Sequence, residues 1–177
     1  VVQELGVVNL DAHTDVRPLI NGLAHSGSGF RQLLEDKSFN MNQFIEFGIQ
    51  SFSASVQHCE YVQAAGGKVV FYDEIRKSGF EAAFAAALEK AATDTKGMYI
   101  SFDIDAIASA YAPGVSAPAA MGFTAYEYCR AALMAGQHPL TRVIDIVEVN
   151  PMYDIDGRTA KLAALIAAHA MGGIAMR

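Results

Sequence analysis

Short, continuous apolar runs alternate along this chain with longer amphipathic stretches. Alternation of this kind is typical of β-α-β units, in which successive strands lie parallel in one sheet. Runs without polar interruptions suit strands that are covered on both faces. We therefore predict an α/β fold with a mainly parallel sheet, built from the strands Leu5–Leu10, Phe44–Ile49, Lys68–Phe71, Met98–Phe102 and Val143–Val149.

The stretches between the strands carry signals that begin and end helices. Ser78-x-x-Glu81 and Thr124-x-x-Glu127 are capping-box patterns, in which each side chain bonds the backbone amide of the other residue. The predicted helices are Phe80–Ala92, Tyr126–Ala135 and Thr159–Met171. Glycines stand where helix C-caps are expected, at Gly66–Gly67, Gly136 and Gly172–Gly173. Neither a repeat nor a linker interrupts the pattern, so we expect residues 1–177 to form a single domain.

Composition narrows the class of protein. The chain has 177 residues, of which 52% are hydrophobic and 18% charged, as in a globular protein with a sizeable core. Its net charge of -6 argues against a nucleic-acid partner, which would normally require a basic face. No apolar run approaches the roughly 20 residues of a membrane span. Cys59 and Cys129 follow no metal-binding spacing, so we expect free thiols rather than a disulfide, in the reducing cytoplasm.

Two acidic clusters follow predicted strands directly. Asp11, His13 and Asp15 come after the first strand, and Asp103 and Asp105 come after the fourth. Parallel strands present their carboxyl ends at one edge of the sheet, where ligands bind in open α/β folds. Long loops, which are often functional, follow both clusters, over Thr14–Gly29 and Ala106–Phe123.

Four carboxylates cannot gather in one place unless cations neutralise them. Carboxylate oxygens with one imidazole suit Mn²⁺ better than the cysteine-rich ligand sets of structural zinc do. So many ligands fit two ions about 3.5–4 Å apart, which lower the pKa of a shared water until it supplies hydroxide near neutral pH. In the alternative interpretation these aspartates only cap the helices that follow. That accounts for one Asp in a loop, but not for five donors in two clusters.

Three segments stand in a recognisable order: DAHTD at Asp11–Asp15, SFDID at Ser101–Asp105 and EVNP at Glu148–Pro151. In order and approximate spacing they resemble the ureohydrolases, the family of arginase, agmatinase and formimidoylglutamase. The resemblance extends across almost the whole chain. It implies a three-layer α/β/α fold with a binuclear manganese site.

The resemblance also implies the role of each ligand. In the family pattern Asp11 and Asp103 bridge the two ions, Asp15 binds one ion only, and His13 and Asp105 bind the other. The family supplies a further metal-binding His from a Gly-Gly-x-His-Ser motif upstream of the first cluster, and this chain contains no such motif. We therefore expect one ion to lack a ligand and the first strands of the sheet to be missing. On this interpretation the chain is the C-terminal portion of a ureohydrolase-type catalytic domain.

Further residues match positions that bind substrate or move protons in the family. Glu148 would hold a cationic amidine or guanidine group, and His25 or Asp105 would relay a proton to the leaving nitrogen. Arg17 stands two residues after Asp15, where the arginase pattern carries an Asn. A guanidinium forks onto a carboxylate with two bonds, so Arg17 suits a dicarboxylate substrate. Spacing alone also allows a surface Arg here, and a solvent-exposed His at position 25.

The stretches Asp15–Pro18, Phe47–Ser51 and Glu148–Ala160 resemble formimidoylglutamase most. The resemblance therefore implies a small-molecule substrate, N-formimidoyl-L-glutamate, hydrolysed by a metal-bridging hydroxide to L-glutamate and formamide in histidine breakdown. Family members commonly form homo-oligomers. Two alternatives stay open: arginase or another guanidino-acid hydrolase, and a truncated metal-binding remnant without activity. We interpret the histidines outside the clusters as structural or surface residues: His58, His138 and His169.

Overall fold

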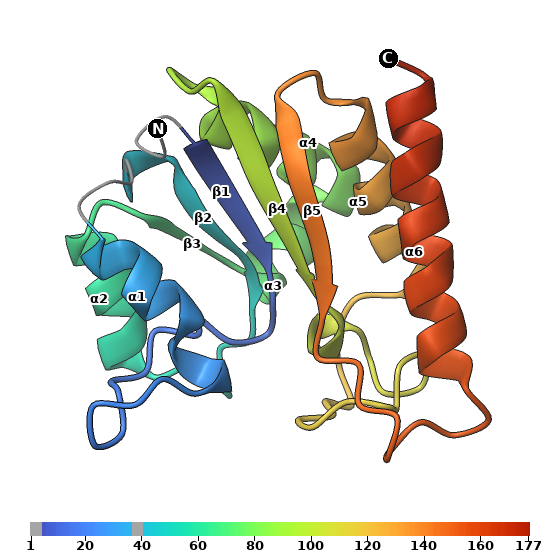
Figure 1. Ribbon diagram of the computed structural model, residues 1–177, viewed down its shortest axis with the longest axis horizontal. Helices are drawn as coiled ribbons and strands as arrows, with labels where there is room; N and C mark the ends of the chain where they lie inside the picture. The colour runs from blue at the N-terminus through green and yellow to red at the C-terminus, as the bar shows by residue number, and fades with distance from the viewer. Residues whose placement is uncertain (1–4, 37–40) are drawn as a thin grey trace.

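Five parallel strands form one sheet in the order β3-β2-β1-β4-β5 in the computed structural model, which describes residues 5–36 and 41–177 (Figure 1). The strands are β1 Leu5–Leu10, β2 Phe44–Ile49, β3 Lys68–Phe71, β4 Gly97–Asp103 and β5 Thr141–Val147. The first three have the predicted bounds, and β4 is longer by one residue at each end. β5 begins and ends two residues before the predicted strand.

Helices cover both faces of the sheet, which confirms the α/β/α prediction (Figure 1). On one face lie α1 Gly29–Glu35 and α2 Val56–Ala64. On the other lie α3 Tyr72–Ser78, α4 Phe80–Ala92, α5 Ala125–Gln137 and α6 Arg158–Ala175. Short 3₁₀ turns stand at Ser26–Ser28, Met41–Gln43 and Ile104–Ala106. No described helix is long and apolar enough to cross a membrane.

Alternation along the strands divides the core into two clusters. Val7 packs with the α1 and α2 side, and its neighbour Val8 packs with the α3 to α6 side, because successive side chains of a strand point to opposite faces. Both side chains are at most 2% exposed, which explains why the strand is mainly apolar in sequence. The free thiols of Cys59 and Cys129 are buried, one in each cluster, as expected from the sequence.

One of the two predicted capping boxes is present. Thr124 Oγ1 accepts a hydrogen bond from the Glu127 amide at 3.2 Å, and the Glu127 carboxylate accepts one from the Thr124 amide at 2.8 Å. The other prediction is wrong: Ser78 belongs to α3, and its hydroxyl donates to the Glu74 carbonyl at 3.0 Å. α4 begins instead after Gly79, whose φ of 90° turns the chain sharply between the two helices.

The predicted C-cap glycines have two different roles. Gly66, with φ of 100°, follows α2 as predicted. Gly136, Gly172 and Gly173 lie inside helices, so the prediction is wrong for them. A Cβ at Gly136 would overlap the backbone of Ala170, and one at Gly173 would overlap the backbone of α5. At these two positions the missing side chain lets α5 and α6 approach closely.

Candidate metal and substrate site

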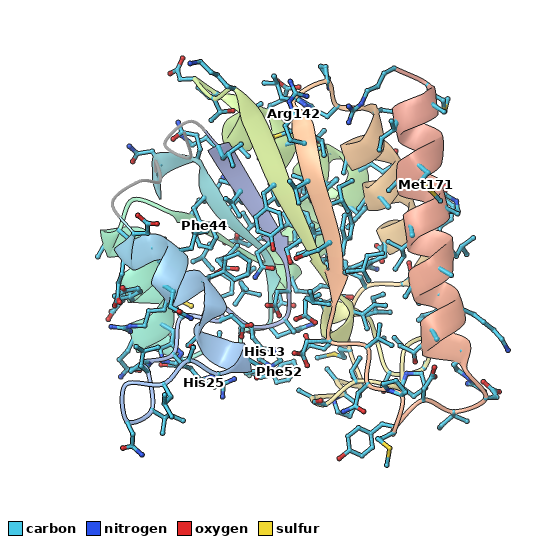
Figure 2. All side chains as sticks on the ribbon, viewed as in Figure 1. His13, His25, Phe44, Phe52, Arg142 and Met171 are labelled. Carbon is cyan, nitrogen blue, oxygen red and sulfur yellow. The ribbon has the colours of Figure 1, made fainter. Side chains whose placement is uncertain are left out.

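The two acidic clusters meet at the carboxyl edge of the sheet. β1 and β4 are neighbours, and Leu10 pairs with Phe102, so Asp11 and Asp103 leave adjacent strands at the same level. Figure 2 shows His13 near this end of the strands. The clusters border a cavity of about 340 Å³ whose lining includes His13, Asp15, Arg17, Asp103, Asp105 and Glu148. The structure thus brings together six residues that the sequence singled out.

The ligand atoms fall into two groups of three that share Asp11. In the first group, Asp11, His13 and Asp105 each offer an atom within 4.8 Å of the others. His13 Nδ1 lies 3.1 Å from Asp105 Oδ2 and 3.5 Å from Asp11 Oδ1. The second group consists of Asp11, Asp15 and Asp103, within the same limit. Asp11 therefore stands where a bridging ligand would, whereas Asp103 joins only the second group.

Burial and mutual repulsion disfavour ionisation of these carboxyl groups when no cation is bound. Burial, then the charge of Asp11, raises the pKa of Asp15 to about 7 and that of Asp103 well above its ordinary value. Burial likewise raises the pKa of Asp11. Hydrogen bonds to Asp105 and Asp11 raise the pKa of His13 to about 10. A positive charge is therefore strongly favoured at the centre of the cluster.

These residues fit divalent cations. Carboxylate oxygens with one imidazole are a hard ligand set, and two groups of three with a shared member match a pair of ions. Asp105 Oδ1 is buried and has no hydrogen-bond partner among the described residues, although a buried carboxylate oxygen normally has one. Its other oxygen, Oδ2, lies beside His13 Nδ1, so this carboxylate keeps an unused acceptor for a bound cation.

The backbone at two of these positions is left-handed. Asp15 has φ of 46° and Glu148 has φ of 65°. For any residue other than glycine, this backbone conformation is unfavourable in free energy. Glu148 follows β5 directly, so this reversal ends the strand at Val147, earlier than predicted. The Asp15 carbonyl accepts hydrogen bonds from the amides of Phe30 and Arg31 at the start of α1. That helix therefore holds the first cluster's loop in place.

Asn9 and Glu46 support the first cluster from inside the sheet. The Asn9 amide donates to Asp11 Oδ2 at 3.1 Å and to Glu46 Oε2 at 2.9 Å. Both residues are fully buried and face each other across β1 and β2. Burial, then the charge of Asp11, raises the pKa of Glu46 well above its ordinary value. Sequence reasoning missed this pair, although a Glu inside an apolar strand was a visible signal.

Tyr128 ties the ends of the two central strands together. Its hydroxyl on α5 lies 2.7 Å from the Asp103 carbonyl oxygen and 3.2 Å from the Leu10 carbonyl oxygen. The side chain is fully buried. Burial and the charge of Asp103 raise the pKa of Tyr128 well above its ordinary value, so the hydroxyl stays protonated and donates. The relative position of the two clusters thus depends on a residue outside both motifs.

Arg17 is distinguished among the arginines of the described chain. Among the described residues, the Arg17 guanidinium makes no hydrogen bond and no ion pair, whereas the guanidinium of every other described arginine contacts an acidic side chain or a backbone carbonyl. It lines the cavity together with Ser53, Ser55 and His58 at the start of α2. Burial and the charge of Arg17 lower the pKa of His58. Reading His58 as structural or surface overlooked this place in the cavity wall, which its helical position did not reveal.

His25 has a different environment from the other candidate site residues. It lies on the loop between β1 and α1, and its Nε2 atom is 3.1 Å from the Pro18 carbonyl oxygen (Figure 2). The neighbouring Ser26, and not His25, belongs to the cavity lining. Its role in proton transfer stays a prediction. His138 lies at the end of α5 and His169 on α6, both away from the cavity.

Comparison with known proteins places this arrangement in context. The family model described as Arginase matches residues 1–173. Formimidoylglutamase of Geobacillus kaustophilus is 36% identical over 168 residues, which are 94% of this chain and 50% of that protein. Proclavaminate amidinohydrolase of Streptomyces clavuligerus is 33% identical over 166 residues, which are 93% of this chain and 52% of that protein. The chain spans about half the length of the curated relatives it matches.

Solved structures agree with the sequence comparison. The crystal structure of Trypanosoma cruzi formiminoglutamase with two Mn²⁺ ions has a TM-score of 0.94 and 37% sequence identity. That match covers 99% of this chain and 58% of the other chain. Formimidoylglutamase from Bacillus subtilis has a TM-score of 0.93 at 30% identity, covering 97% of this chain and 53% of the other. The fold seen here is therefore that of these enzymes over the shared part.

Proposed function

The chain belongs to the arginase family, and from this premise we propose that it is the catalytic part of a formimidoylglutamase. The reaction would convert N-formimidoyl-L-glutamate and water to L-glutamate and formamide, a step of histidine breakdown. Similarity to formimidoylglutamases of several organisms supports the choice of substrate. The main observation in favour of this substrate is the guanidinium of Arg17, which lines the cavity bordered by the two acidic clusters and has no partner among the described residues.

The proposed cofactor is a pair of Mn²⁺ ions. Asp11, His13, Asp15, Asp103 and Asp105 would hold them, in the two groups described above. When bound, the ions supply a water of lowered pKa and positive charge near the reacting carbon. His13 must lose its proton to bind, because only the neutral imidazole has a lone pair to offer.

The remaining side chains of the cavity would bind and orient the substrate. Glu148 would pair with the cationic formimidoyl group, and its left-handed backbone turns this residue out of β5 toward the cavity that it lines. Arg17 would hold one substrate carboxylate with two parallel hydrogen bonds. Asp105 or His25 would pass a proton to the leaving nitrogen, so that glutamate departs as a neutral amine or an ammonium. Asp105 belongs to the second cluster and lines the cavity, whereas His25 does not line it.

We also propose a single catalytic domain over residues 1–177, a small-molecule substrate and a cytoplasmic location. The two buried free thiols support a reducing compartment. Homo-oligomer formation belongs to the same proposal.

A substrate panel on the metal-loaded chain tests the function. Formamide release from N-formimidoyl-L-glutamate is expected, and Arg17→Ala should raise KM far more than it lowers kcat, because Arg17 contributes to substrate binding and not to the chemical step. A fall in kcat without a rise in KM would contradict the role of Arg17. Lys68→Ala is a suitable control, since Lys68 is exposed at the start of β3, at the opposite end of the sheet.

A guanidino acid is the second candidate substrate. The similarity to proclavaminate amidinohydrolase, a relative whose name denotes action on an amidino group, favours it. Urea release from a guanidino acid, without formamide release from formimidoylglutamate, would establish this alternative. Metal content measured on the same sample separates both from a remnant without activity, which would turn over nothing in the panel.

A further inference from the structure

The guanidinium of Arg17 lies directly on the backbone of Gly27. The Gly27 carbonyl accepts a hydrogen bond from the Arg17 amide at 2.8 Å, which joins the start and the end of the loop after β1. A Cβ built on Gly27 would overlap Nη2, Nε and Cζ of Arg17. The side chain of Arg17 therefore occupies the space that any side chain at position 27 would need.

Backbone conformation does not require a glycine at this position. Gly27 has φ of −83° and ψ of 17°, which residues with side chains adopt in turns. Gly27 is buried although Arg17 is exposed, as expected when a flat guanidinium covers the peptide. The steric requirement for glycine thus comes from Arg17 and not from the turn Ser26–Ser28.

From this contact we propose that Gly27 is a positioning residue, which determines specificity by letting the Arg17 guanidinium lie flat on the Ser26–Ser28 turn and present its edge to a substrate carboxylate. The inference rests on the proposed function, since it takes Arg17 as the group that binds that carboxylate. A guanidinium held flat against a peptide loses less rotational freedom on binding than one that moves in solvent. Gly27 would therefore favour dicarboxylate substrates over analogues that lack the charge.

Gly27→Ala tests the inference because the structure predicts where the strain is relieved. The overlapping atoms belong to the far end of a flexible side chain, so Arg17 can move and the fold can stay intact. Gly29 provides the matched control two residues further along. It has φ of −60° at the start of α1, and no atom lies within 4 Å of its Cβ position, so Gly29→Ala adds a methyl group to open space.

The experiment measures two quantities on the metal-loaded chain for wild type, Gly27→Ala, Gly29→Ala, Arg17→Ala and the Arg17→Ala/Gly27→Ala double variant. One is the dissociation constant of the product L-glutamate by calorimetry, and the other is KM and kcat for formimidoylglutamate. Gly27→Ala should weaken glutamate binding and raise KM about tenfold, with kcat changed less than threefold. Gly29→Ala should behave as wild type. The double variant should bind glutamate no more weakly than Arg17→Ala, because Gly27 acts only through Arg17.

Several results would overturn the inference. The first is that Gly27→Ala binds glutamate as tightly as wild type does. The second is that the double variant loses glutamate affinity by the sum of the losses in the two single variants. The third is that the wild type does not bind glutamate. If Gly27→Ala unfolds, the inference requires the double variant to fold, because removing Arg17 removes the overlap. Failure of the proposed function is distinguishable, since a wild type that binds glutamate in the expected pattern but releases no formamide would refute the reaction and leave the role of Gly27 intact.

Discussion

Tyr128→Phe is expected to weaken the junction between the two central strands. The substitution removes one buried hydroxyl that serves the Leu10 and Asp103 carbonyls and leaves the aromatic ring in place. A lost hydrogen bond that leaves buried polar groups unsatisfied costs about 1–3 kcal/mol. Since the hydroxyl is fully buried and shared by two acceptors, we expect about 2 kcal/mol. That loss corresponds to a decrease in Tm of roughly 4–8 °C for a domain of this size.

Metal binding should respond to the same change. The hydroxyl connects the strand ends that carry Asp11 and Asp103, and groups that orient metal ligands typically contribute about 10–100-fold to affinity. We therefore expect Mn²⁺ to bind Tyr128→Phe at least tenfold more weakly than it binds wild type. Urea unfolding of the metal-free chain measures the stability term, and calorimetric titration measures the affinity.

Tyr126→Phe is the control for this prediction. Tyr126 lies on the same helix and is 69% exposed, so loss of its hydroxyl should change stability by less than about 0.5 kcal/mol. If Tyr128→Phe unfolded at the same urea concentration as wild type and Tyr126→Phe, the hydroxyl of Tyr128 would not stabilise the junction. A loss of stability without any loss of metal affinity would refute only the link between the hydroxyl and the ligands.

Three further predictions concern the cluster and the core. Asp103→Ala should remove metal and turnover together, measured as metal per chain and formamide release on one sample; full metal content without turnover would contradict it. The metal-free chain should unfold at lower urea concentration at pH 8 than at pH 5. Burial raises the pKa of Asp15 to about 7, so the folded chain holds this proton more tightly than the unfolded chain does, and stability falls progressively as pH rises from about 4 to 7. Hydrogen bonds to acidic neighbours raise the pKa of His13 to about 10. The stabilisation from protonated His13 is therefore complete below about pH 6.5 and is lost as pH rises toward 10. A urea midpoint that increased with pH would contradict the predicted direction for both Asp15 and His13. Gly6→Ala would place a methyl group on the backbone of α4, so urea unfolding should show a loss of about 1–3 kcal/mol, whereas Gly172→Ala, in open space, should show none.

The strands were the most predictable part of the fold. A strand buried on both faces is mainly apolar, so Leu5–Leu10 and Phe44–Ile49 stand out from the polar residues around them even though each contains one buried polar residue, Asn9 or Glu46. β5 was displaced by two residues because its end depends on the left-handed backbone of Glu148, which no apolar pattern records. The sequence did not give bounds for α1 and α2, because α1 has no buried residue and α2 only two, so the apolar periodicity is weak.

The structural roles of the glycines were the least predictable from sequence. The same residue type ends a helix at Gly66, admits a neighbouring helix at Gly136 and leaves room for a guanidinium at Gly27. Local sequence cannot separate these cases, because the neighbour that needs the space comes from a distant part of the chain.

The candidate site was predictable where its residues cluster in sequence. Asp11, His13 and Asp15 follow one strand at a spacing of two, which made them visible in the sequence, although a bend at residues 12–13 and the left-handed backbone of Asp15, not an extended chain, place them around the site. Glu46 and His58, which lie inside a strand and on a helix and belong to no motif, were missed. Their position becomes evident only when the sheet order is known.

Asp11 belongs to both groups of three potential ligands, so the metal site is less free to change at Asp11 during evolution than at the residues of a single group. A new ligand at His13 alters one group, and a new ligand at Asp15 alters the other, so each half can be adjusted separately. A new ligand at Asp11 alters both halves in one step and also breaks the bond from Asn9. In the proposed metal site, metal preference could therefore diverge at His13 or Asp15 one at a time, whereas a change at Asp11 would affect both groups of three and the contact with Asn9 in β1.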